Sequence, residues 1–465
     1  WPADAVAKDV STSQWGTTVA FAESPVKEGL LYLGTDDGLI QVSEDGGSNW
    51  TKISTFPDVP EYTYVSDILP SSFNENVVFA SFNNIKSDDF KPYLLQSNDK
   101  GQTWESIVSD LPEDQSIHTI SQDPVKEDLL FTGTEFGIYF TVDGGSHWVK
   151  LGSGLPDIAV RDIAIQEREN DLVIATFGRG FYIIDDYSPL RQVTEETIKN
   201  EEAIIFPVKD ALMYIKTGSG RYGTGAGYYQ AENPEFGAVF TYYLKDVPKS
   251  LKSKRLKKEK VLFKEGNPIP QPDKATLDAE KNETKPYLVF SIKDEDGNLI
   301  RNIYKKPSTG INRINWDMRY KSSWPIRLSN DKFDPLKSGG TSLRALPGKY
   351  TVTMSMFYNG EQKELAGPVE FNTVVLNNRT LPAPSDKDAL TFYKKVTELY
   401  RVMSGTMRYR DELAEKTSYS QQALQSVDNA SVSLKNEMHQ IKQELDNIEF
   451  KFDGTAAKAS SEEVH

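Results

Sequence analysis

The sequence contains no cysteine, few histidines and no long apolar run. The absence of cysteine excludes disulfides, thiolate metal sites and cysteine nucleophiles. No apolar stretch reaches the roughly 18 residues of a spanning helix, so we expect no membrane span. HExxH, Walker and nucleophile-elbow motifs are also absent. The four histidines are scattered along the chain: His118, His147, His439 and His465.

Positive charge is in short supply as well. The chain carries 53 Lys and Arg against 68 Asp and Glu, which gives a formal net charge of -15. Nucleic-acid binding depends on clustered positive charge that neutralises phosphates, so this balance argues against a nucleic-acid partner. We predict no cofactor and no metal.

The sequence begins at Trp1 and shows no signal peptide. We therefore expect the natural N-terminus to be missing, through processing or truncation. The length of 465 residues suits two or three domains.

Internal repetition is the strongest feature present. Residues 23–38 read ESPVKEGLLYLGTDDG and residues 122–137 read QDPVKEDLLFTGTEFG. Gly34 and Gly133 fall at the same place in the two stretches, 99 residues apart. Such a long match indicates a repeat architecture.

A shorter motif recurs three times, as SEDGGSNW, SNDKGQTW and TVDGGSHW. Each fits Ser/Thr-x-Asp-x-Gly-x-x-Trp, and the three Asp residues are 54 and 44 residues apart. That spacing is typical of one four-stranded propeller blade. The motif residues are Ser43, Asp45, Gly47, Trp50, Ser97, Asp99, Gly101, Trp104, Thr141, Asp143, Gly145 and Trp148.

Each motif follows an apolar strand and predicts a hairpin turn. Asp accepts backbone N–H bonds within a turn, Gly tolerates positive φ, and the Trp that follows is placed to fold back over the turn. We therefore predict a structural role for these Asp residues; a catalytic or metal-binding role is the alternative.

The three motifs resemble Asp boxes, or BNR repeats, of sialidases, xyloglucan-active propeller glycosidases and the sortilin (VPS10) ectodomain. The sequence from GTDDGL to ATFGRGFYIIDDYSPLRQ is most similar to the C-terminal half of large secreted bacterial proteins described as BNR/VPS10-type, glycosyl hydrolase-like. The resemblance implies boxes on the outer rim, seven or more blades, and a location outside the cell or on its surface.

Residues 171–186 read as a fourth blade segment without a box. We therefore predict about four propeller blades over residues 1–193, too few to close a ring. An open arc leaves sheet edges and a blade face exposed. We expect an upstream propeller half, or another chain, to complete the ring.

The remaining segments differ in pattern. Residues 194–234 are predicted to be a linker, because the Gly-rich stretch 218–229 does not fit a phosphate loop. Residues 235–380 alternate with period two and predict a β-sandwich of the immunoglobulin or FlgD-like type. A basic insertion at 248–285, with seven basic residues and one acid between 249 and 260, is predicted to be a solvated, partly helical loop.

The C-terminal part is helical by pattern. Apolar residues at i, i+3 and i+4 over 385–452 predict an αα-hairpin with a break near Ser418, and Ser385 or Asp386 is placed to cap it. Residues 453–465 are predicted to be disordered. The fold class is therefore mainly β: a partial propeller, a β-sandwich and a C-terminal helical hairpin.

A glycosidase would need carboxylates at the propeller mouth, and spacing selects no pair. The weak candidates lie at strand ends or in loops: Asp36, Asp37, Glu135, Asp162, Asp185 and Asp186. Arg161 and Arg179 are candidates for a sialidase-like arginine set, whose third member is not identifiable.

Two functions of different classes follow. The first is an exported or cell-surface scaffold that binds a protein or glycan, which the many Tyr and Trp residues suit. The second is a polysaccharide-active glycoside hydrolase with a carboxylate acid/base pair at the mouth. Fold alone does not separate them.

Overall fold

The computed structural model describes residues 16–152, 154–215, 231–325, 332, 334–337, 339–376 and 385–454. The chain divides into two compact units, Trp1–Glu201 and Glu202–His465. Strands outweigh helices, as expected from the sequence, and a helical hairpin follows the β structure.

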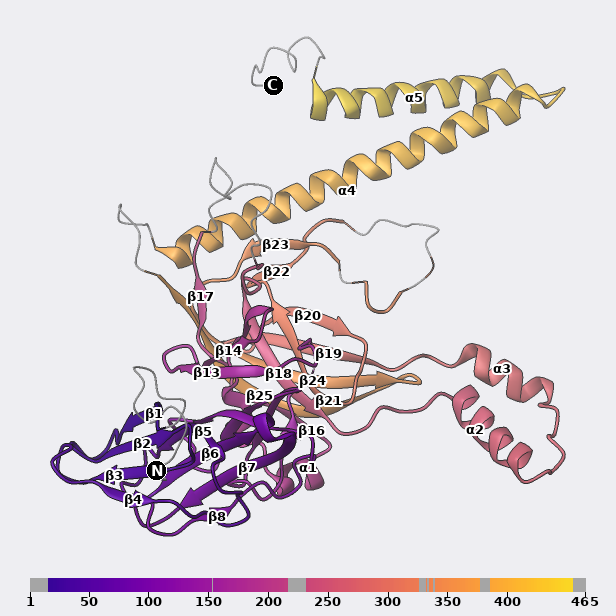
Figure 1. Ribbon diagram of the computed structural model, residues 1–465. Helices are drawn as coiled ribbons and strands as arrows, with labels where there is room; N and C mark the ends of the chain where they lie inside the picture. The colour runs from indigo at the N-terminus through magenta and orange to yellow at the C-terminus, as the bar shows by residue number, and fades with distance from the viewer. Residues whose placement is uncertain are drawn as a thin grey trace. The chain divides into compact units, whose positions relative to one another are not determined.

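The first unit contains four antiparallel sheets in sequence order, drawn in indigo to purple in Figure 1. Three of them have four strands and the last has three. The strands are β1 (Thr18–Glu23), β2 (Leu31–Thr35), β3 (Ile40–Ser43), β4 (Thr51–Ile53), β5 (Tyr64–Pro70), β6 (Val78–Asn84), β7 (Asp89–Ser97), β8 (Glu105–Ser106), β9 (Ile117–Gln122), β10 (Leu130–Thr134), β11 (Gly137–Thr141), β12 (Val149–Lys150), β13 (Val160–Gln166), β14 (Asp171–Thr176) and β15 (Gly180–Ile184).

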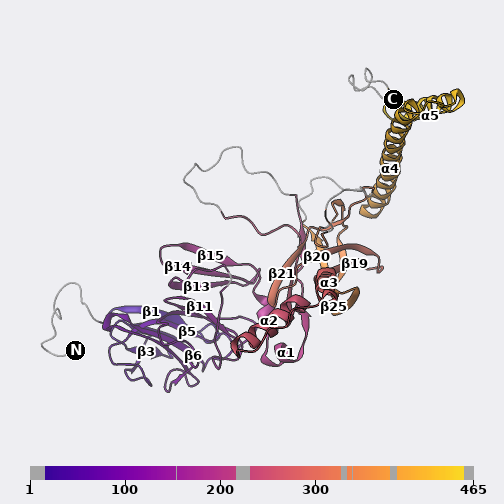
Figure 2. The same ribbon diagram turned by 90° about the vertical axis from the view of Figure 1, so that its right-hand side faces the viewer.

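The first strands of successive sheets lie side by side, β1 next to β5, β5 next to β9 and β9 next to β13. Each first strand also contacts the second strand of the preceding sheet. Figure 2 shows the β13–β15 sheet beside β11 of the third sheet. Sheets stacked face to face around their first strands are the blades of a β-propeller, so we number them blades one to four.

Two glycines let neighbouring blades approach closely. A Cβ atom on Gly34 would lie 2.5 Å from Val65 Cγ1 of blade two, and one on Gly133 would lie 2.7 Å from Val160 Cγ1 of blade four. The glycines of the long repeat are therefore explained by packing between blades. Their equivalents in blades two and four are the small residues Ser81 and Ala175.

Short helical segments accompany the blades. They are the 3₁₀ turns η1 (Ile85–Ser87) and η2 (Ser188–Gln192) and the helix α1 (Glu195–Asn200). The side chains of Tyr187 and Arg191, at η2, both bind the buried Asp123 of blade three; Tyr187 Oη donates to Asp123 Oδ2 over 2.6 Å. The chain is thus anchored to blade three where it leaves blade four.

The second unit is built on a β-sandwich with one apolar core that includes Trp316, Phe290 and Phe240. One sheet has the order β16-β18-β21 and the other β17-β25-β24-β19-β20. A small β22-β23 sheet accompanies them. The strands are β16 (Ala203–Ile205), β17 (Ala211–Met213), β18 (Ala238–Leu244), β19 (Tyr287–Asp294), β20 (Leu299–Lys305), β21 (Gly310–Trp316), β22 (Arg319–Lys321), β23 (Thr341–Arg344), β24 (Gly348–Tyr358) and β25 (Glu361–Val375).

Strands β19, β24 and β25 are neighbours in the larger sheet, and β16, β18 and β21 form the other sheet of the sandwich. Tyr350, near the start of β24, donates its hydroxyl to Leu346 O over 2.7 Å. This bond ties the segment before β24 to the strand itself.

The sandwich begins inside the segment predicted as a linker. β16 and β17 are only three residues long and are flanked by charged residues and Pro207, so their alternation is too short to recognise in the sequence. The Gly-rich stretch 218–229 lies outside the described residues, as do residues 455–465 of the predicted tail. Residue 453 of that tail belongs to a helix.

The basic insertion forms two helices, α2 (Leu251–Lys264) and α3 (Lys274–Asn282). Arg255 of α2 joins them, because its Nε lies 2.6 Å from Glu280 Oε1 of α3. Its Nη1 also pairs with Glu259 within α2.

Figure 1 shows α4 (Asp386–Gln425) and α5 (Val432–Asp453) running antiparallel as the predicted hairpin. Ser385 caps α4 by accepting a bond from Asp388 N. The break predicted near Ser418 is wrong, because α4 continues through it to Gln425. The Thr417 and Ser420 hydroxyls donate to carbonyls four residues earlier, so these polar side chains are accommodated within the helix.

We predict that Gly133→Ala destabilises the first unit. The new methyl group would meet Val160 Cγ1 and Val160 O, so the unfolding free energy should fall by about 1–3 kcal/mol. Urea unfolding followed by circular dichroism measures this. Gly152→Ala is the control, because no atom lies within 4 Å of its added Cβ, and it should change the free energy by less than about 0.5 kcal/mol. Equal effects would contradict the close packing of the blades.

Candidate functional site

A β-bulge recurs at the same place in the first strand of every blade. The pairing with the second strand shifts by one residue at each of these positions, which are Val19, Ser66, His118 and Arg161. Bulges re-aim side chains and are common next to active sites. The side chains of the last two bulges meet.

His118 is the centre of a polar cluster between blades three and four. Its Nε2 lies 2.8 Å from Glu135 Oε2, in the β10–β11 turn, and its Nδ1 lies 3.0 Å from Arg161 Nη1. Arg161 Nη2 is also 3.7 Å from Glu135 Oε2, and its guanidinium lies 5.3 Å from the centre of the Phe177 ring. Two of the predicted candidates, Glu135 and Arg161, are thus brought together.

The imidazole of His118 is buried, whereas Arg161 and Glu135 reach solvent. Burial lowers the pKa of His118, the hydrogen bond with Glu135 opposes this shift, and the charge of Arg161 adds to it. His118 is therefore neutral at pH 7, and a neutral imidazole that accepts from Arg161 at Nδ1 donates to Glu135 at Nε2. The three side chains therefore hold one another in place between blades three and four.

A second feature is the pair Asp67 and Asp162, which occupy the position after the bulge in blades two and four. Asp67 accepts bonds from Thr119 Oγ1 (2.9 Å) and Ile120 N (3.0 Å) of blade three. Burial raises the pKa of Asp67, and the charge of Asp162 raises it further. The hydrogen bonds lower the pKa but do not cancel this rise. Asp162 is exposed, with Oδ1 accepting from Ile163 N.

Asp36 and Asp37 lie in the β2–β3 turn, apart from the His118 cluster. Asp36 Oδ1 accepts from Thr17 N over 2.8 Å, and Asp37 Oδ1 accepts from the Thr35 hydroxyl over 2.5 Å. Asp37 therefore holds its own turn, and Asp36 ties that turn to the residue before β1.

Asp185 and Asp186 follow β15, at the opposite end of blade four from Arg161. Asp186 closes the exit turn, since its Oδ1 accepts from the Ser188 hydroxyl over 2.6 Å. Arg179 is exposed in the β14–β15 turn. Neither acid joins the His118 cluster, because a strand's length separates them from it.

The three predicted turn motifs share one set of hydrogen bonds. In the first, Asp45 Oδ1 accepts from the Ser43 hydroxyl (2.9 Å) and from Asn49 N (2.8 Å), and Ser43 Oγ accepts from Gly47 N (2.8 Å). Asp99 and Asp143 repeat this pattern. The pKa values of all three carboxyls are lowered, for Asp45 chiefly by its bonds from Asn49. Acids committed to turns in this way are structural.

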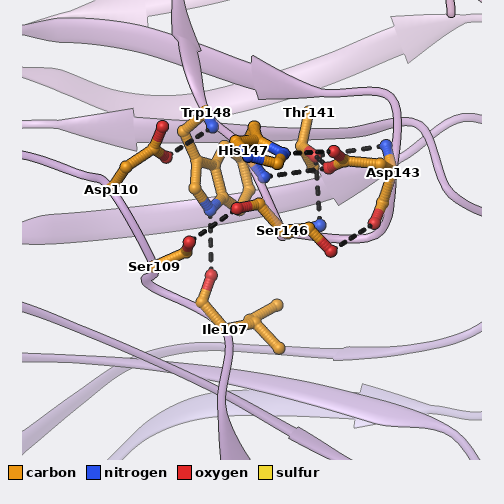
Figure 3. A network of polar contacts seen from close by, with 9 residues as sticks. Ile107, Ser109, Asp110, Thr141, Asp143, Ser146, His147 and Trp148 are labelled. Atoms are coloured by element: carbon orange, nitrogen blue, oxygen red, sulfur yellow. Dashed lines mark hydrogen bonds and ion pairs between the residues drawn. The ribbon is translucent and has the colours of Figure 1, made fainter. Parts of the chain in front are cut away.

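The tryptophans that end the motifs differ. Trp50 Nε1 and Trp104 Nε1 donate to the carbonyls of Gly47 and Gly101 in their own turns, as predicted. Trp148 instead donates to Ile107 O of the preceding blade over 2.9 Å and is buried (Figure 3). Figure 3 also shows Asp110 accepting from Trp148 N. The third motif therefore joins two blades.

Blade four has a free face. The registers of β10–β11 and β14–β15 match residue for residue, so Phe181 is equivalent to Ile138 and Ile183 to Phe140. Ile138 and Phe140 are 1% and 8% exposed, on the face of blade three where Gly133 meets blade four. Phe181 and Ile183 are 76% and 60% exposed.

Within the described ranges, no cluster of three or more His, Asp or Glu side chains is placed to hold a metal ion. Over the same part of the chain, no helix is long and apolar enough to cross a membrane.

His118 and Asp67 are the site residues that the sequence candidates omit. A signal for Asp67 was present, because Val65–Ile68 and Val160–Ile163 both read V-x-D-I. Aligning these first strands would also have placed His118 at the bulge. The contact between His118 and Arg161 depends on how blades three and four stack, which a single sequence does not encode locally.

Comparisons with known proteins leave the family open. No protein-family model and no curated protein matches the chain. A structure of YCF48 bound to D1 peptide is 17% identical with a TM-score of 0.30, over 38% of this chain and 57% of that one. YCF48 from Cyanidioschyzon merolae is 16% identical with a TM-score of 0.27, over 36% of this chain and 52% of that one.

The GH74 xyloglucanase from Xanthomonas campestris is 12% identical with a TM-score of 0.31. The match covers 75% of this chain and 45% of the xyloglucanase. The chain thus spans about half the length of each of these proteins, and the propeller assignment rests on the blades themselves.

We predict that His118 makes the first unit less stable in acid. The pKa of folded His118 is lowered, so the unfolded chain takes up a proton at about pH 6.5 while the folded cluster resists it. The stabilisation is present above that pH and is lost as the pH falls. Urea midpoints at about pH 7.5 and 5.5 should differ less in His118→Gln than in the wild type.

His147→Gln is the matched control, because His147 affects the pH dependence of stability in the opposite direction to His118. Its bond to Asp143 raises the pKa of His147, so this residue stabilises the fold more as the pH falls. His147→Gln should therefore steepen the loss of stability in acid. Parallel curves for wild type and His118→Gln would contradict the neutral, buried imidazole.

Proposed function

We propose that the chain is a propeller scaffold that functions by binding a partner along the free face of blade four. The observation that carries the proposal is the exposure of Phe181 and Ile183, where the equivalent residues of blade three are buried. Burying one such side chain stabilises a complex by about 1.5–3 kcal/mol. An apolar sheet face of this kind marks an interface.

The partner that fits this face is a further propeller blade. Blade four covers blade three with the apolar residues Ile163, Leu172 and Ile174, and a fifth blade would cover blade four in the same way. The opposite end of the arc supports this, because Phe21 of blade one is 62% exposed whereas its equivalents Ile68 and Ile163 are buried. The blades would come from an upstream half of the same polypeptide or from another chain.

We predict that this chain alone associates through the free face. Sedimentation velocity over a range of concentrations should show assemblies larger than the monomer. The double variant Phe181→Asp/Ile183→Asp should sediment as a monomer. Its unfolding free energy should stay within about 0.5 kcal/mol of the wild type, since both side chains are solvated in the isolated chain.

Phe90→Asp is the control, because Phe90 is an exposed aromatic on β7 of blade two, away from the free face. It should leave the association unchanged. A well-folded wild-type chain that remains monomeric at every concentration would refute the proposal.

The turn motifs support a narrower assignment. Their shared hydrogen bonds and the wording of the repeats favour an Asp-box protein of the sortilin/VPS10-like type, exported to the bacterial surface. Fractionation of the source cells with an antibody to the chain tests the export. Protein found solely in the cytoplasm would contradict it.

Glycoside hydrolysis is the second candidate function. The observation that favours it is the Asp67–Asp162 pair, in which one carboxyl has a raised pKa and the other is exposed. A raised pKa suits a general acid, and an exposed carboxylate is accessible as a base or nucleophile.

If this second function holds, Asp162→Asn should abolish hydrolysis of plant or microbial polysaccharides while the protein stays folded. Reducing-sugar release across a broad substrate panel measures it, and Asp186→Asn is the control acid from the opposite end of the blade. The absence of hydrolysis in a ring completed by its partner blades would remove the enzymatic alternative.

A further inference from the structure

The second unit contains a cavity that neither the blades nor the Asp67–Asp162 pair involves. It has a volume of about 460 Å³ and lies between β22 with the segment after it and the first half of α4. Its lining includes Trp324, Tyr320, Lys321, Lys394 and Ser342. Small-molecule sites in proteins fall in this range of size and combine apolar with a few polar groups.

Three separate contacts hold α4 across the cavity. The Trp324 and Tyr400 rings meet edge to face, with centres 5.1 Å apart. Lys394 Nζ lies 5.2 Å from the centre of the Tyr320 ring. Arg408 Nη1 donates to Pro325 O over 2.9 Å. The two walls are therefore fixed before any ligand binds, which reduces the entropy cost of binding.

The cavity is positive although the chain is acidic. Lys321 and Lys394 have no carboxylate within salt-bridge distance in the described part of the chain, whereas Arg401 is held by Glu398 through two bonds of 2.8 and 2.5 Å. Neither ammonium group thus has a carboxylate partner among the described residues of a protein of net charge -15, and Lys394 contacts the face of the Tyr320 ring. A ligand with carboxylates would pair with both.

An exposed indole stands beside these charges. Trp324 is 56% exposed and packs against Tyr400 in a T-shaped arrangement, so its position is set although more than half of it reaches solvent. The hydroxyls of Ser323 and Ser342 lie 3.4 Å apart nearby. The negative face of an aromatic ring attracts the polarised C–H bonds of a sugar ring, and serine hydroxyls bond to sugar hydroxyls.

We infer that this cavity binds an acidic oligosaccharide, with a sugar ring on Trp324 and uronate carboxylates on Lys321 and Lys394. A neutral sugar would leave the ammonium groups unpaired, and a small inorganic anion would leave the indole uncovered. This inference is independent of the proposed function, because it involves no residue of the blades.

Isothermal titration of the full chain with trigalacturonate, a uronate trimer, tests the inference. Binding should occur, weaken at least tenfold in Trp324→Ala and in Lys394→Ala, and weaken as salt is added. Lys395→Ala and Phe392→Ala are matched controls on α4, since both residues are exposed and outside the cavity lining, and they should bind as the wild type does.

Cellotriose, a neutral trimer, and inorganic phosphate are the comparison ligands. Failure of both to compete with trigalacturonate supports the inference. The inference is overturned if trigalacturonate does not bind, or if cellotriose or phosphate binds with the same affinity. It is also overturned if Trp324→Ala and Lys394→Ala both bind trigalacturonate with the wild-type affinity. Circular dichroism of each variant confirms that the fold is retained.

Discussion

The structure of the first unit depends on the two-sided burial of each blade. A blade is a thin twisted sheet with apolar side chains on both faces, so it is stable only between two neighbours. Blade two meets this condition clearly, because the cluster that includes Phe82 packs between it and blade one and the cluster that includes Leu94 packs between it and blade three. Gly34 and Gly133 permit the close approach that it requires. The exposed residues Phe21 of blade one and Phe181 and Ile183 of blade four lie on faces that no described blade covers.

The polar side chains on the first strands also depend on the close stacking of neighbouring blades. A bulge changes the direction of one side chain relative to the regular alternation of the strand, which can bring that side chain to the neighbouring blade. This is why His118 meets Arg161 and why the Ser66 hydroxyl donates to Ile117 O of blade three. The polar contacts between blades and the apolar packing between blades therefore use the same strands, so a substitution that alters one alters the other.

Much of the fold was predictable from the sequence, because repeats and alternation are local. The blades, the longer sandwich strands and the hairpin were predicted from such patterns, whereas the three-residue strands β16 and β17 were missed. The site was found in part: Glu135 and Arg161 were candidates, but their meeting at buried His118 depends on stacking between blades. Trp148 shows the same limit, because its partner Ile107 belongs to another blade.

The anchor of Asp123 to Tyr187 and Arg191 has a consequence for how the arc comes apart. Blade four has one uncovered face and three strands, so alone it would be the first part to open. Asp123 is fully buried and its ion pair with Arg191 spans 2.8 Å, which ties the exit of blade four to the interior of blade three. Separating the two blades would leave the carboxylate of Asp123 without its Arg191 partner, which is costly for a buried charge. The last two blades are thereby joined into one cooperative unit, and the segment leading to the sandwich departs from a fixed point.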